Sequence, residues 1–117
     1  MLMSIPDLIT EVSAHIRKIS AVDAKAEMLE NHGLLIDVRE PAEHAAMPAH
    51  GAINIPRGLL EMKLLEIEKD ETRPIYLHCA TAARATLSAE QLKRIGYENV
   101  TVITCKAPII QAAYQPN

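Results

Sequence analysis

Apolar residues in the first part of the chain recur at helical spacing. Residues 5–16 place an apolar stripe on one face, and Ser4 with Pro6 suits the start of a helix. The stripe runs on to two further isoleucines, and its members are Ile5, Leu8, Ile9, Val12, Ile16 and Ile19. Amphipathic stretches at 21–33, 58–71 and 85–96 predict three more helices, the first ending at Gly33 and the last at Gly96.

Short continuous apolar runs predict strands that are buried on both faces. They are LLIDV at 34–38, GAINIP at 51–56, PIYLHC at 74–79 and NVTVITC at 99–105. The segment between the first two, which contains Pro41 and Pro48, is interpreted as a loop. Because such strands alternate with helices, we expect an α/β fold. Its central sheet should be mostly parallel, with about four to five short strands flanked by helices and an extra N-terminal helix.

Composition narrows the function classes. With 117 residues, the chain is long enough for one domain with a single core. The absence of Trp and Phe and the net charge of -3 argue against a nucleic-acid surface, which usually offers aromatic rings and a basic face. No apolar run is long enough to span a membrane, and the N-terminal residues lack the pattern of a secretory signal. Two cysteines in such a chain indicate reduced thiols, so we expect a cytoplasmic location.

The most informative stretch is PIYLHCATAAR, at 74–84, where a buried strand ends in Cys79. Four small residues follow before Arg84 and a helix, so their backbone amides can turn inward around one atom or anion. The helix N-terminus and the Arg84 guanidinium both favour a thiolate, which is the nucleophilic form of cysteine. A buried cysteine that only fills space is the alternative for Cys79 alone. The combination of strand, cysteine, small loop, arginine and helix favours a functional site.

Four segments together resemble the rhodanese-like domain family: LLIDVREPAEH, GAINIP, PIYLHCATAAR and LKRIGYENVTVI, in family order and spacing. The resemblance covers about residues 18–106. It divides a single domain, 1–117, into an extra N-terminal helix at 1–17, the family core at 18–106 and a short C-terminal tail at 107–117. It implies a sulfurtransferase whose loop cysteine, here Cys79, takes up sulfane sulfur as a persulfide and passes it to a thiophilic acceptor.

The resemblance also implies roles for particular residues. Glu43 matches an acid with a structural role, and His78, which in a strand points away from Cys79, is expected to be packed. The expected substrate-binding residues are the loop residues Ala80, Thr81, Ala82, Ala83 and Arg84, with Asp37 and Arg39 near the rim. From Cys79 to Arg84 the loop has six residues. Phosphatase relatives have seven, which suits a tetrahedral phosphate, whereas the shorter loop suits a single sulfur.

Some positions depart from the family pattern. Ala82 replaces a common glycine, and if that position needs a positive φ, alanine costs about 1 kcal/mol or more. MPA at 47–49 replaces a usual Gly-His-Ile, and the usual Gly-Gly and Trp after the last strand are missing, so the final helix should be short. Because the loop holds no cation besides Arg84, thiosulfate is an unfavourable physiological donor. These departures bear on turnover more than on fold.

Cys105 ends the last predicted strand, and two interpretations stay open. It is a redox partner that resolves a Cys79 persulfide or pairs with Cys79, or it is a small residue that fills space. His32, His44 and His50 match no zinc spacing, and we expect surface or capping roles, no metal and no cofactor.

The expected partners are a small sulfur donor (thiosulfate, polysulfide or persulfide) and a thiol or cyanide acceptor, without nucleic acid or membrane, in a monomer or homodimer. The alternative functions are a catalytically inactive interaction or redox-sensor module and, less favoured, a cysteine phosphatase or arsenate-reductase-like enzyme.

Overall fold

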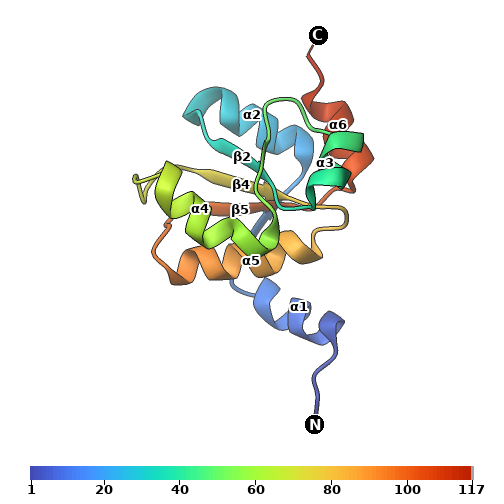
Figure 1. Cartoon of the computed structure of the whole chain (residues 1–117), viewed down its shortest axis with the longest axis vertical. Coiled ribbons are helices and arrows are strands. Elements are labelled where there is room, and N and C mark those ends of the chain that lie inside the picture. The colour runs from blue at the N-terminus through green and yellow to red at the C-terminus, as the bar shows by residue number, and fades with distance from the viewer. Residues whose placement is uncertain (117) are drawn as a thin grey trace.

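A five-stranded, all-parallel sheet forms the centre of the protein in a computed structural model, which describes residues 1–116 (Figure 1). The strands lie in the order β1-β5-β4-β2-β3. Their bounds are β1 Arg17–Ile19, β2 Leu34–Asp37, β3 Ile53–Asn54, β4 Ile75–His78 and β5 Val100–Ile103. This arrangement confirms the predicted α/β fold and the number of strands. The sequence had located four of the five, and the strand that it missed is β1.

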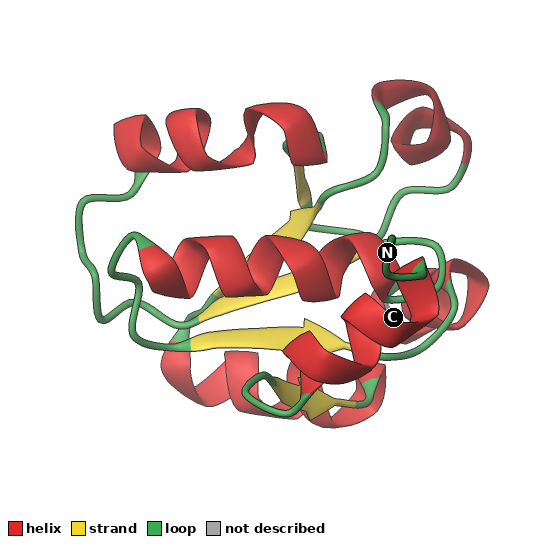
Figure 2. Cartoon of the chain, turned by 90° about the horizontal axis from the view of Figure 1, so that it is seen from below, coloured by secondary structure: helices red, strands yellow, loops and turns green. Residues whose placement is uncertain are grey.

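Helices cover both faces of the sheet, and Figure 2 shows the strands running between them. One face packs against α1 (Ile5–Ser13), α4 (Leu60–Ile67) and α5 (Ala83–Arg94), whereas the other packs against α2 (Ala21–Asn31) and α6 (Ala107–Tyr114). Two short elements, α3 (Pro41–Ala46) and the 3-10 turn η1 (Arg57–Leu59), connect β2, β3 and α4. Each face has its own apolar core, so successive residues of β2, β4 and β5 are buried on opposite sides, as their apolar runs predicted. The edge strands β1 and β3 keep exposed residues.

The register of the two central strands brings two segments of the predicted site together. Asp37, the last residue of β2, is paired with His78, the last residue of β4. Because all strands are parallel, the segments that follow them emerge at the same edge of the sheet. Cys79 and the segment from Val38 onward therefore lie next to one another, although they are far apart in the sequence.

Three segments differ from the sequence-based expectation. The first helix ends at Ser13, and Arg17–Ile19 form the edge strand β1, so Ile16 and Ile19 do not belong to a helical stripe. A three-residue strand is too short to show a period of two, so Ile19 and the preceding Ile16 also fitted a helical period. The segment taken as a loop contains α3, which begins at Pro41 with a capping box.

The C-terminal segment forms α6, an eight-residue helix that packs on α2 through the buried Ile110 and Tyr114. Asn117, the last residue of the expected tail, lies outside the described residues. Within the described part of the chain, no helix has both the length and the apolar character needed to cross a membrane.

Candidate active site

The candidate nucleophile lies where β4 gives way to the loop before α5. Cys79 follows the last residue of β4, and its side chain belongs to the apolar core on the α1, α4 and α5 face. Its exposed fraction is 1%. Its Sγ accepts a hydrogen bond from the amide of Ala85 at 3.3 Å, in the first turn of α5. The sulfur therefore sits at a helix N-terminus, where amide donors and the helix dipole favour negative charge.

Ala82 has the conformation that a glycine at this position would adopt most easily. Its φ is +76° and its ψ is -11°, which is the left-handed region. The carbonyl oxygen of Ala82 accepts hydrogen bonds from the Thr86 amide at 2.8 Å and the Thr86 hydroxyl at 2.7 Å. These two bonds fix the start of α5 and maintain the left-handed residue. The position does need a positive φ, so the strain expected for alanine is present.

The amides of the loop have no acceptor among the described residues. Within residues 1–116, the N–H groups of residues 80–84 donate no hydrogen bond to another residue. The loop is held from its carbonyl side instead, because the Ala80 carbonyl accepts from the Ala107 amide at 3.2 Å. This bond joins the loop to the start of α6. A loop with several unpartnered amides beside a cysteine sulfur can stabilise negative charge on that sulfur or on an atom bonded to it.

Arg84 closes the loop, and its guanidinium is bound to a carboxylate on α3. Its two terminal nitrogens donate to Glu43 Oε1 at 2.7 Å and to Glu43 Oε2 at 3.0 Å. Glu43 is itself held in place, since Oε1 also accepts from the Glu40 amide at 3.1 Å within the capping box. The hydrogen bonds from Arg84 lower the pKa of Glu43 to about 2 and raise the pKa of Arg84. The charge expected from Arg84 is therefore largely neutralised in this structure.

Asp37 and Arg39 are close to the loop along the sheet edge, but they face each other. Asp37 is fully buried, and Arg39 is 4% exposed. The Arg39 side chain donates three hydrogen bonds to the Asp37 carboxylate, the shortest at 2.7 Å, and one to the Met47 carbonyl at 2.7 Å. Burial raises the pKa of Asp37, yet the Arg39 hydrogen bonds outweigh it and lower that pKa overall. Their geometry supports a bracing role for the segment that holds α3.

Two histidines complete this cluster. His44 Nδ1 lies 2.9 Å from Asp37 Oδ2, so His44 is a partner of the carboxylate rather than a surface residue. His78 is buried on the face opposite Cys79, as predicted, with Nε2 4.0 Å from the same oxygen. Neither ring nitrogen of His78 has a hydrogen-bond partner within residues 1–116. Burial lowers the pKa of His78 to about 4, so its ring is neutral at physiological pH.

Cys105 lies in the loop after β5, beyond the last strand residue, Ile103. Its Sγ accepts from the Ala21 amide at 3.3 Å, and its side chain packs against the core on the α2 and α6 face. Cys79 belongs to the other core, and both thiols are free. A bond between the two sulfurs would require one loop to move, and the redox role of Cys105 stays a prediction.

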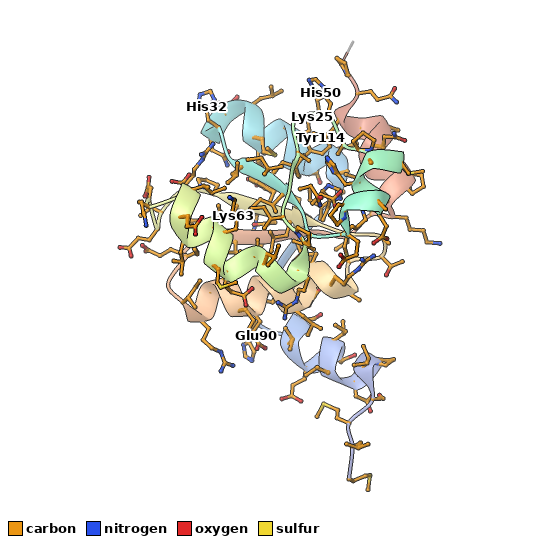
Figure 3. The ribbon with its side chains drawn as sticks, viewed as in Figure 1. Lys25, His32, His50, Lys63, Glu90 and Tyr114 are labelled. Atoms are coloured by element: carbon orange, nitrogen blue, oxygen red, sulfur yellow. The ribbon has the colours of Figure 1, made fainter. Side chains whose placement is uncertain are left out.

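The remaining histidines lie away from this edge. His32 and His50 are exposed on the side of the molecule that carries α2 and α6 (Figure 3). His32 ends α2 in a left-handed conformation, which is a capping role. Among residues 1–116, no three His, Cys, Asp or Glu side chains gather as a metal ion would require.

Sequence reasoning missed the Arg84–Glu43 pair and the contact of His44 with Asp37. The sequence held one signal for the first, because Glu40, Pro41 and Glu43 form the pattern that starts a helix. Nothing in the sequence spacing joins residue 43 to residue 84. Their contact follows from the pairing of β2 with β4.

Comparison with known proteins agrees with this geometry. The family model for the Rhodanese-like domain matches residues 20–105. A curated protein named Sulfurtransferase from Allochromatium vinosum is 34% identical over 67 residues, which are 57% of this chain and 61% of that protein. The chain spans about half to three-fifths of the length of the curated relatives it matches.

Solved structures share the fold along almost the whole chain. The polysulfide-sulfur transferase homodimer of Wolinella succinogenes has a TM-score of 0.77 and 28% identity, covering 93% of this chain and 82% of that one. A Rhodopseudomonas palustris protein of unknown function, described as a possible tyrosine phosphatase, has a TM-score of 0.81. It covers 99% of this chain and 95% of that one at 21% identity, which supports the fold alone. On the family match and the fold together, the chain belongs to the rhodanese-like domain family.

Proposed function

We propose that this chain transfers sulfane sulfur from a donor to a thiophilic acceptor through a persulfide on Cys79. The observation that supports this most is the position of Cys79 Sγ beside the Ala85 amide, below a loop whose amides have no acceptor within residues 1–116. A persulfide adds one sulfur atom and places the negative charge on it. The loop amides of residues 80–84 are the donors available to hold that charge.

The reaction has two steps that balance. The Cys79 thiolate attacks the sulfane sulfur of the donor, the bond between that sulfur and the rest of the donor breaks, and the leaving group departs with the electron pair. An acceptor thiolate or cyanide then attacks the outer sulfur of the Cys79 persulfide, which releases the original thiolate. No external oxidant or reductant is consumed. The polysulfide-sulfur transferase relative supports polysulfide as a donor, and the relative named as a putative thiosulfate sulfurtransferase supports thiosulfate.

Intact-protein mass spectrometry tests the proposal. The protein is exposed briefly to thiosulfate or, separately, to polysulfide, with Cys79→Ser and Cys105→Ser alongside. We expect a gain of one sulfur atom that is lost in Cys79→Ser, kept in Cys105→Ser and removed by cyanide. Failure of both donors to add sulfur to Cys79 would contradict the proposal.

A second candidate is a binding or redox-sensing module that does not turn over. It is favoured by the 1% exposure of Cys79 and by the occupied guanidinium of Arg84, since both limit access to the loop. In that case Cys79 would react slowly with small donors and would not pass sulfur to cyanide.

Because the Wolinella succinogenes relative is a homodimer, we also propose that this chain forms a homodimer. Size-exclusion chromatography with light scattering tests this proposal.

A further inference from the structure

The charge balance at the mouth of the Cys79 loop is set by a residue outside the loop. Arg84 is the sole charged residue between positions 79 and 84. Both of its terminal nitrogens are bound by the Glu43 carboxylate. The two side chains are 37% and 39% exposed, so the pair lies at the solvent-facing rim while Cys79 lies below it. An incoming donor meets a neutral ion pair rather than a free cation.

Glu43 is well placed to stay in this position. The capping box of α3 directs its Oε1 toward the Glu40 amide as well as toward Arg84. Its pKa of about 2 keeps it ionised throughout the physiological range. To use Arg84 as an anion site, a donor would have to displace a carboxylate that already makes three hydrogen bonds. The displaced charge of Glu43 would then remain next to the donor.

The direction of attack on the donor makes the charge of the leaving group important. In the displacement at sulfur, the leaving group lies on the far side of the transferred atom from Cys79, toward the rim. The loop amides can hold the transferred sulfur, which carries one charge. For a second charge on the leaving group, the candidate partners within residues 1–116 include the Arg84–Glu43 pair and the exposed Lys106, which precedes the residue bonded to Ala80. They also include Arg57 of η1, an element that contacts α5.

Building on the proposed sulfurtransferase function, we propose that Glu43 is a specificity-determining residue. By neutralising Arg84, it disfavours donors whose leaving group carries an extra negative charge. The site then prefers sulfane donors with singly charged or neutral leaving groups, such as organic persulfides and thiosulfonates. Specificity of this kind arises from a repulsive element against the wrong ligand rather than from a new attraction to the right one.

Thiosulfate and methanethiosulfonate provide a matched pair of donors, because a methyl group in the second replaces one charged oxygen of the first. With thiosulfate, the Cys79 thiolate takes the outer sulfur and sulfite leaves with two negative charges. With methanethiosulfonate, the same bond breaks and methanesulfinate leaves with one. The readout is the ratio of the two rate constants for sulfur uptake by Cys79, which is independent of the fraction of active protein.

Four variants separate the outcomes. In Glu43→Gln we expect the ratio of the rate constant with thiosulfate to that with methanethiosulfonate to rise on the order of fivefold. This is the effect expected of one charge at a partly exposed site. In Arg84→Gln the unpaired Glu43 should lower it by a similar factor, and the double variant should return to within about twofold of the original ratio. Glu27→Gln is the control.

The control removes the same charge from a comparable pair at the opposite edge of the sheet. Glu27 on α2 binds two nitrogens of Arg17, at the start of β1, and the hydrogen bonds from Arg17 and Tyr76 lower its pKa to about 2. The donor ratio in Glu27→Gln should stay within about twofold of the original value. An equal rise in Glu27→Gln would show a net-charge effect and overturn the inference.

An unchanged ratio in Glu43→Gln, with sulfur still taken up by Cys79, would also overturn the inference and leave the proposed function intact. Another charged group would then determine the choice of donor. Lys106, next to the residue that is bonded to Ala80, is one such group. No uptake from either donor in the unaltered protein would instead refute the proposed function, on which the inference rests. Circular dichroism and the melting temperature check that each variant is folded, so that the donor ratios are compared between folded proteins.

Discussion

Replacing Ala82 with glycine removes a methyl group from a residue held in the left-handed region. The φ of Ala82 is +76°, and the carbonyl is fixed by two hydrogen bonds from Thr86. The side chain is partly buried and packs against the core that contains Cys79. The substitution therefore relieves backbone strain and removes a small apolar contact. It also increases the conformational entropy of the unfolded chain.

The three effects can be weighed. A non-glycine residue in the left-handed region costs roughly 1–2 kcal/mol relative to glycine. The additional freedom of glycine in the unfolded chain costs about 0.4–1 kcal/mol, and the lost contact of a partly buried methyl group costs less than about 0.8 kcal/mol. The free energy of unfolding of Ala82→Gly should thus lie between about 0.8 kcal/mol lower and about 1.6 kcal/mol higher than that of the original protein.

The matched control is Ala26→Gly, at an exposed position within α2. The unfolded-state effect is the same in both variants, but Ala26 has helical geometry and no strain to relieve. Ala26→Gly should lower the free energy of unfolding by about 1 kcal/mol. The assay is urea unfolding followed by circular dichroism, with the free energy from linear extrapolation. Because the unfolded-state effect cancels, the two variants should differ by the strain less the lost methyl contact, which is roughly 0.2–2 kcal/mol.

A loss of stability in Ala82→Gly as large as that in Ala26→Gly would refute the reasoning. It would mean that the loop does not hold Ala82 in the left-handed region, or that its methyl contact outweighs the strain. The same variant also bears on the reaction. Because glycine adopts this φ freely, the loop should keep its shape, and the rate of sulfur uptake by Cys79 should change less than about threefold.

Three further predictions concern stability. The pKa of His78 is about 4 in the folded protein and 6.5 in the unfolded chain, so the unfolded chain binds a proton first as the pH falls. The free energy of unfolding should therefore fall between pH 6.5 and pH 4, by up to about 3 kcal/mol. Urea unfolding at several pH values checks this, and His78→Asn should flatten the profile in that window. In Gly33→Ala the new Cβ would lie 2.6 Å from the Tyr76 ring, so the free energy of unfolding should fall by about 1–3 kcal/mol. In the control Gly58→Ala the new Cβ meets nothing within 4 Å, and the free energy of unfolding should change by less than about 1 kcal/mol. Leu64→Ala, at a fully buried core position, should lower the free energy of unfolding by about 2–5 kcal/mol, and a loss below 1 kcal/mol would contradict the packing described for α4.

Local patterns determined a large part of this protein. The apolar runs identified β2, β3, β4 and β5. For β2, β4 and β5 the reason is that strands buried on both faces need continuous hydrophobicity, whereas β3 is an edge strand with the exposed Ile53. The order of cysteine, small residues, arginine and helix located the candidate nucleophile, since each of these features depends only on neighbouring residues. The strain at Ala82 was also visible in the sequence, as a departure from a glycine position.

Short elements escaped sequence analysis. The edge strand β1 has three residues and α3 has six, and neither is long enough to display its own period. Tertiary contacts stabilise both elements, and α3 also has the local capping box at its start. β1 exists because it pairs with β5, and α3 is fixed through the ion pair of Glu43 with Arg84.

The sequence by itself thus determined the fold class, the family resemblance and the position of Cys79. Only the tertiary structure decided what surrounds that cysteine. It paired Asp37 with Arg39 and His44, directed Cys105 to the opposite core, and neutralised Arg84 with Glu43. The physical reason is that charge balance depends on distances between side chains. Those distances are set by strand register and helix placement, which join residues that lie far apart in the sequence.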